Sequence, residues 1–211
     1  MNNYKEMELR EVINKRKTIR DFQNKEISEH IIEYAIQNAF KAPTYNHLRD
    51  WDFIILNSLE PKLKLIESEN INDSVNIEEL ERIFKGKESI MKEMYIDAIP
   101  KQKKMILEAP KVIIVVYKPK IKVKEAKRIY DLNCLASVWT CIQNFLLSLA
   151  EDDVFGVTFI PQNIDSIKDK FNIPQDLEIA SVIPIGYKSE DAKILKQKKI
   201  NISERTHNEE W

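Results

Sequence analysis

The chain has 211 residues, a length that allows one domain or two small ones. Lys and Arg total 33 and Asp and Glu total 34, so the net charge of −1 excludes a globally basic nucleic-acid-binding protein and a protein with a long acidic tail. Hydrophobic residues make up 43% and charged residues 32%, as in globular domains, and three glycines are too few for a turn-rich all-β fold.

The first residues are charged and contain no apolar segment, which is not the pattern of a secretory signal. The two cysteines, Cys134 and Cys141, cannot form a disulfide framework. We therefore expect a cytoplasmic protein with reduced thiols, without a membrane or nucleic-acid partner.

Two helices and a strand are expected in the N-terminal quarter. Apolar spacing predicts an amphipathic helix over 4–15 and a second helix from the N-cap Ser28 through Phe40, before Pro43. A polar turn over 44–51 then leads to a short buried strand at 53–56.

The middle of the chain alternates between charged helices and apolar segments. Residues 60–108 have helical propensity and a weak apolar pattern, with breaks at Gly86 and Pro100, and they predict a helical excursion or lid. The β-branched run 111–117 predicts a strand buried on both faces, in the centre of its sheet. A long helix over about 126–151 follows.

The C-terminal third predicts two more strands, at 154–160 and 180–187, separated by a short helix at 163–171. Pro184 indicates that its half of the last strand lies at an edge or a bulge. Helices interspersed with strands favour one α+β domain over 1–211, with a mixed sheet flanked by helices.

The stretch 132–150 carries no charged residue. Its apolar residues form a seam with a period of 3.5, and a second apolar stripe lies beside it. The seam is Leu132, Leu135, Trp139, Ile142, Leu146 and Leu149, and the stripe is Cys134, Val138, Cys141 and Phe145. Burial within the chain and packing against a second copy both explain such a wide surface, whereas six polar residues argue against a membrane span.

A basic run follows the first predicted helix. Arg16, Lys17 and Arg20 surround the hydroxyl of Thr18, and such a set of donors suits a phosphate group. Cations at the end of a helix also stabilise its dipole without binding any ligand, so the run alone leaves both interpretations open.

The turn over 42–51 gathers several polar side chains immediately before a strand. It contains Pro43, Thr44, Tyr45, Asn46 and His47, and loops on a rigid scaffold are common places for binding groups. The alternative interpretation is a helix stop followed by ordinary turn residues and a core Trp51.

Five motifs in order make the chain resemble the FMN-dependent nitroreductase family. Residues 16–22 resemble its basic-hydroxyl-basic motif, and Ala42-Pro43-Thr44 with Trp51 resembles its first loop. The others are Gln143-Asn144-Phe145 in the long helix, Phe155-Gly156-Val157 through Ile160-Pro161, and the late pair Ile173-Pro174 and Ile183–Tyr187. The loop departs from the family where His47 and Arg49-Asp50 stand in place of the usual Asn and Gln-Pro.

This resemblance implies an α+β fold with a mostly antiparallel sheet and an intertwined homodimer holding two FMN sites at its interface. It implies that Arg16, Arg20, Lys196 and Lys198 bind the phosphate, and that Lys17 and Thr18 line the ribityl and ring side. It places Pro43, Thr44, Tyr45, Asn46 and His47 on the partner subunit's side of the site, and the Ile160-Pro161-Gln162 backbone near flavin N5.

The activity implied by the resemblance is a ping-pong transfer of hydride from NADH or NADPH through FMN to a small electron-deficient acceptor, such as a nitroaromatic or a quinone. It needs no catalytic side chain and no metal. Three alternatives stay open: a flavin-binding sensor or store, a dehalogenase-like or flavin-fragmenting enzyme of the same fold, and an interaction module that dimerises through 132–150. The sequence does not distinguish NADH from NADPH and does not name the acceptor.

Overall fold

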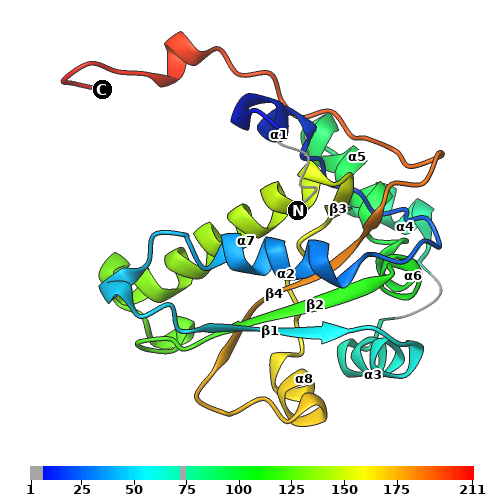
Figure 1. The fold of residues 1–211 in the computed structure, drawn as a ribbon. Coiled ribbons are helices and arrows are strands. Elements are labelled where there is room, and N and C mark those ends of the chain that lie inside the picture. The colour runs from blue at the N-terminus through cyan, green and yellow to red at the C-terminus, as the bar shows by residue number, and fades with distance from the viewer. Residues whose placement is uncertain (1–6, 72–74) are drawn as a thin grey trace.

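The computed structural model describes residues 7–71 and 75–211. Its sheet contains β1 (Trp51–Leu56), β2 (Lys111–Tyr117), β3 (Val154–Gly156) and β4 (Glu178–Tyr187), in the order β1-β2-β4-β3. All three strand pairs are antiparallel. The sequence predicted a mixed sheet, but parallel pairing between described residues is limited to one isolated bridge, from Thr18 to Gly156. Helices cover both faces of the sheet, so the fold is of the α+β class (Figure 1).

Eight α-helices are present among the described residues. They are α1 (Leu9–Lys15), α2 (Glu29–Ala39), α3 (Leu59–Glu69), α4 (Ile77–Ile83), α5 (Ser89–Ala98), α6 (Gln102–Glu108), α7 (Asn133–Glu151) and α8 (Ile164–Phe171). Four short 3-10 turns lie at Tyr45–His47, Val123–Glu125, Ile129–Leu132 and Ile202–Arg205. The helical excursion predicted at 60–108 is helical in α3 to α6, and the predicted breaks at Gly86 and Pro100 lie between helices, but the break between α3 and α4 was not predicted.

Strand β2 separates two apolar cores, because successive side chains of a strand point to opposite faces. Ile113, Val115 and Tyr117 pack with α2 and α7 on one face. Val112, Ile114 and Val116 pack with α3, α6 and α8 on the other. Every residue of β2 is buried, and the prediction of a central strand is confirmed.

Helix α7 lies beside α2 over the first core, and its buried residues come from both rows, since Ile142 and Leu149 of the seam are buried as deeply as the second stripe. Val138, Cys141 and Phe145 have no exposed surface, whereas Leu135 and Trp139 of the seam are only half-buried. By length and composition, the helical stretch 129–151 could cross a membrane. However, its buried stripe packs against the sheet, as in a core helix of a globular domain.

Several boundaries differ from the sequence prediction. The first helix begins at Leu9, and residues 4–6 of its predicted span lie outside the described residues. The long helix begins at Asn133 rather than near 126, because two 3-10 turns occupy the residues before it. The third strand ends at Gly156, after which only Phe159 forms a further bridge, to Val182.

The prediction that Pro184 marks an edge or a bulge was wrong. Pro184 lies inside β4, opposite Val112 of β2, and the bulge of the sheet falls between Val115 and Val116. The Pro184 carbonyl accepts a hydrogen bond from Val157 N–H at 3.3 Å, on the side away from β2. Since the N–H and C=O of a strand residue point to the same side, the missing N–H removes no bond to β2.

The chain after β4 runs away from the sheet as an extended tail (Figure 1). It exposes the apolar side chains of Ile194, Ile200 and Ile202, and Trp211 is almost fully accessible.

Candidate functional site

A cavity of about 430 Å³ brings together residues from three distant parts of the sequence. The segment after α1 supplies Arg16, Lys17, Thr18 and Arg20, helix α5 supplies Ile90 and Met94, and the tail supplies Ile194 through Lys198. The volume lies in the range of roughly 300–1,000 Å³ that is usual for small-molecule sites. All six residues that the resemblance assigned to the phosphate and the ribityl side, Lys196 and Lys198 included, line this one cavity.

The segment 16–20 is held beside the sheet by backbone bonds and one buried side chain. Thr18 bridges Gly156, and Ile19 N–H donates to the Gly156 carbonyl at 3.4 Å. The Ile19 side chain has no exposed surface and belongs to the second core. A Cβ on Gly156 would lie 2.9 Å from Ile185 Cγ2, so only glycine fits at this approach. Burial of Ile19 thus fixes Thr18 and Arg20 at the cavity wall.

The cavity carries an excess of positive charge. Arg20 pairs with Asp97 of α5 at 3.4 Å, and Lys198 pairs with Glu88 at 2.9 Å. Lys17 Nζ donates to the Asn14 carbonyl at 2.7 Å. No carboxylate of the described residues pairs with Arg16 or Lys196. Such donors suit an anionic group, above all a phosphate.

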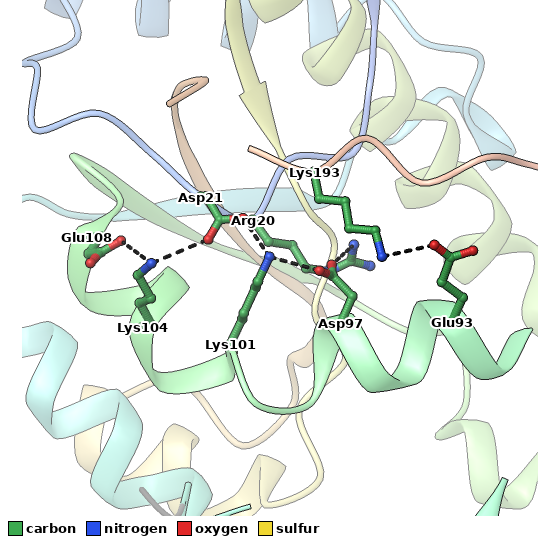
Figure 2. A network of polar contacts seen from close by, with 8 residues as sticks. All are labelled: Arg20, Asp21, Glu93, Asp97, Lys101, Lys104, Glu108 and Lys193. Carbon is green, nitrogen blue, oxygen red and sulfur yellow. Dashed lines mark hydrogen bonds and ion pairs between the residues drawn. The ribbon is translucent and has the colours of Figure 1, made fainter. Parts of the chain in front are cut away.

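Figure 2 shows that Arg20 belongs to a wider ionic network beside the cavity. Lys101 Nζ donates to Asp21 at 2.7 Å and to Asp97 at 2.8 Å, and thereby links the N-terminal segment to α5. Lys104 contacts Asp21 at 3.5 Å. Burial lowers the pKa of Lys101, but its two aspartate partners outweigh burial, and the pKa is raised above its usual value.

The loop over 43–47 lies in a different place, against the first turns of α7. Tyr45 N–H donates to Ser137 Oγ at 2.9 Å, and Thr140 Oγ1 donates to the Pro43 carbonyl at 3.1 Å. Asn46, His47 and Arg49 all have φ between 51° and 56°, the left-handed region that costs non-glycine residues energy. The structure around the loop therefore holds it in a strained shape, which is common at binding sites.

Tyr45 also contacts a group of residues that the sequence did not single out. Its hydroxyl hydrogen-bonds the hydroxyl of Tyr130, and the two rings meet edge to face. Lys120 Nζ lies 3.8 Å from the centre of the Tyr130 ring. The hydrogen bond to Tyr45 and the charge of Lys120 lower the pKa of Tyr130, whereas the same hydrogen bond raises the pKa of Tyr45. The loop thus presents a phenol pair with a nearby cation.

The third predicted segment, Ile160-Pro161-Gln162, is fixed by a buried carboxylate. Glu69 at the end of α3 accepts bonds from Gln162 N–H at 2.9 Å and from Asn163 N–H at 2.8 Å. Gln162 and Asn163 line a separate cavity of about 540 Å³ with Lys122 and Lys124. The Gln162 N–H, which the resemblance placed near flavin N5, is therefore already bonded to Glu69.

Within one chain, the structure gathers the phosphate-side residues and keeps the other two segments apart. The loop over 43–47 lines a small cavity of about 10 Å³ with Trp51 and Cys134, and neither it nor residues 160–162 line the cavity of Arg16 and Lys196. Over residues 7–71 and 75–211, no group of three His, Cys, Asp or Glu side chains is placed to hold a metal ion.

Sequence reasoning missed the residues of α5 and α7 that complete these sites. Ile90 and Met94 form an i, i+4 apolar pair on α5, a signal that could have marked this helix as a cavity wall. Lys101, four residues after Asp97, is a local partner, but nothing near Asp97 in the sequence marks its pairing with Arg20, which lies 77 residues away. Ser137 and Thr140 were read only as polar residues in an apolar helix.

The family model described as the nitroreductase family matches residues 13–187, which include all the strands and most of the helices. The chain belongs to the nitroreductase family. The match covers the basic run, the loop over 43–47 and the 160–162 segment, and the fold expected from the resemblance is confirmed apart from the dimer.

Relatives within the family are distant in sequence. Iodotyrosine deiodinase 1 of Mus musculus is 24% identical over 94% of this chain and 71% of its own length. The iodotyrosine deiodinase of Thermotoga neapolitana is 23% identical over 85% of this chain and 88% of its own length.

Solved structures agree on the fold. An iodotyrosine deiodinase bound to FMN and 3-iodo-L-tyrosine has a TM-score of 0.71 at 19% identity, over 92% of this chain and 97% of that chain. A BluB-like flavoprotein from Clostridium difficile 630 has a TM-score of 0.73 at 18% identity, over 97% of this chain and all of that chain. At such identities the likeness shows the fold alone.

Proposed function

We propose that this nitroreductase-family protein is an FMN-dependent oxidoreductase that uses NADH or NADPH to reduce small electron-deficient acceptors. The observation that carries the proposal is a single cavity lined by residues from opposite ends of the sequence. They are Arg16, Lys17, Thr18 and Arg20 near the N-terminus and Lys196 and Lys198 near the C-terminus. A cationic cavity of this size with a hydroxyl donor fits a flavin mononucleotide, whose phosphate needs several charged donors.

When bound, FMN supplies the hydride and electron transfer, since no side chain of this chain is needed as a nucleophile. Arg16 and Lys196 provide charges for the phosphate that no carboxylate of the described residues neutralises. Thr18 adds a hydroxyl donor, and Ile90 and Met94 form the apolar part of the wall. Lys17 at the ring edge would stabilise negative charge on the reduced flavin.

A homodimer is part of the proposal, because a second copy would supply the loop over 43–47 that one chain keeps apart from its own cavity. The half-buried residues Leu135 and Trp139 of α7 and the exposed apolar side chains of the tail support such an interface. Its two FMN sites would then be made of residues from both copies.

The test of the function is an anaerobic visible spectrum of protein reconstituted with FMN, recorded before and after NADH and then NADPH. We expect the bound flavin to bleach with at least one donor, which also identifies the donor. A flavin that binds but does not bleach would favour a sensor or storage protein. Failure to retain FMN would contradict the proposed cofactor and favour an interaction module.

The phosphate assignment predicts the behaviour of Arg20→Ala. We expect FMN affinity to fall at least about tenfold, since a charge-assisted bond to phosphate is lost, while the circular dichroism spectrum is unchanged. Flavin fluorescence quenching gives the dissociation constant. Lys170→Ala is a matched control, because Lys170 pairs with Glu67 at 3.1 Å and lines neither this cavity nor the one beside the loop over 43–47. Unchanged FMN affinity would contradict the role of Arg20.

The proposed dimer predicts that Trp139→Asp gives monomeric protein that retains little FMN. Trp139 lies half-buried on the seam of α7, so an aspartate there would place a charge in the interface. Sedimentation velocity and the bound flavin measure the two effects. A dimeric, flavin-loaded variant would show that the seam is not the interface.

A second candidate is reductive dehalogenation of a halogenated phenol such as iodotyrosine. The observation that favours it is that the curated relatives reported above are iodotyrosine deiodinases. Re-oxidation of the reduced flavin by 3-iodo-L-tyrosine, with iodide released, distinguishes this reaction from nitroaromatic or quinone reduction.

A further inference from the structure

Helix α5 is attached to the rest of the protein mainly by charge. No residue of α5 is fully buried, but the side chain of Asp97 is only 8% exposed and the helix forms one wall of the cavity. Its apolar attachment includes the stacking of Tyr95 on Phe84. Ion pairs hold one of its faces, since Glu93 and Asp97 are four residues apart. Asp97 binds Arg20 and Lys101, and Glu93 binds Lys193 of the tail at 2.9 Å (Figure 2).

Carboxylates at the two ends of α5 are paired with cations that line the cavity. At the C-terminal end, Asp97 lies 3.4 Å from Arg20, and both side chains are at most 10% exposed. At the N-terminal end, Glu88 lies 2.9 Å from Lys198, in an exposed pair. Two of the five cationic side chains that line the cavity, Arg20 and Lys198, are thus already paired with carboxylates of the protein.

We propose that Asp97, and more weakly Glu88, compete with the cofactor phosphate for the cations of this site and so set its affinity. This inference rests on the proposed function. A phosphate that binds Arg20 must share the guanidinium with Asp97 or displace it. Two anions close to one cation repel each other, and the repulsion is strongest where water is excluded, as at the buried Arg20–Asp97 pair.

The network gives Asp97 a second partner that would remain in its place. Lys101 holds Asp97 at 2.8 Å and Asp21 at 2.7 Å, so α5 keeps an attachment when Arg20 turns to a phosphate. Removing the charge of Asp97 therefore leaves Lys101 bonded to Asp21 and α5 still connected to the N-terminal segment. The cavity wall formed by Ile90 and Met94 stays in position.

The competition predicts that Asp97→Asn binds FMN more tightly than the wild type, by about fivefold, the lower end of usual coupling between two ligands. Asparagine keeps the shape of the side chain and one hydrogen-bond acceptor. Glu88→Gln should produce a smaller gain, because its pair is exposed and screened by salt. Asp176→Asn removes the charge of an exposed ion pair that does not line the cavity and should change nothing.

The experiment is a fluorescence titration of the wild type and the three variants with FMN and with riboflavin, which lacks the phosphate. We expect the gain of Asp97→Asn for FMN and not for riboflavin. A gain for both ligands, or no gain for FMN, overturns the competition, as does a loss of FMN affinity. If neither the wild type nor any variant binds FMN, the proposed function fails as well, so the two failures are distinguishable.

Discussion

Helices α7 and α5 both border a candidate site, but different forces hold them in place. Val138, Cys141 and Phe145 of α7 are fully buried against the sheet and α2, whereas α5 has no buried residue and is held by ion pairs. Burial contributes a few kcal/mol for each large side chain, and partly exposed ion pairs contribute much less. The loop over 43–47 therefore rests on a rigid support, while the phosphate-side cavity has one wall, α5, whose position depends on its ion pairs.

The largest difference should appear on truncating one apolar side chain in each helix. Phe145→Ala should lower the free energy of unfolding by about 3–5 kcal/mol, because it leaves a cavity in the core. Met91→Ala on α5, where Met91 is 44% exposed, should change it by about 0.5 kcal/mol or less. Urea denaturation measures both values. Equal effects would mean that α5 is packed more tightly than its exposure indicates.

A smaller effect is expected at Lys101, the centre of the ionic network. Lys101→Met leaves Asp21 and Asp97 without their shared cation, and we expect a cost of about 1–2 kcal/mol, reduced by partial exposure to water. Hydrogen exchange should show faster opening of α5 and unchanged protection of α7. Equal loss of protection in both helices would contradict local attachment.

The same lysine makes the attachment of α5 depend on pH. Because the folded-state pKa of Lys101 is raised, its stabilisation is present below the ordinary pKa of 10.5 and is lost as pH rises through the raised value. Pulse proteolysis should therefore cleave α5 faster in strongly alkaline buffer. Lys101→Arg is the matched control, since arginine stays charged there and should resist cleavage.

The smallest effect concerns the two thiols of α7. Burial raises the pKa of Cys141 to about 12, whereas Cys134 is half-buried. At pH 8 a disulfide reagent should label Cys134 first and Cys141 only on unfolding. The stabilisation linked to the neutral Cys141 thiol is present below its ordinary pKa of 9.0 and disappears as pH rises toward 12. Rapid labelling of both thiols in folded protein would show that α7 opens readily.

Features that depend on neighbouring residues could be predicted from the sequence. A β-branched run predicted β2 as a buried central strand, and helical spacing predicted α2 and the long apolar helix. The ordered motifs identified the family, and the residues they marked on the phosphate side do line one cavity. Local periodicity and motif order are properties of the chain itself, so they can be read without a structure.

Which surfaces and charges meet depends on the tertiary structure. Folding buried Val138 and Phe145 but left Leu135 and Trp139 half-buried, and it placed Pro184 inside the sheet, where its missing N–H removes no bond to β2. It also paired Arg20 with Asp97, and Glu69 with Gln162 N–H. These contacts join residues far apart in sequence, and their energies depend on distance and burial, which folding alone sets.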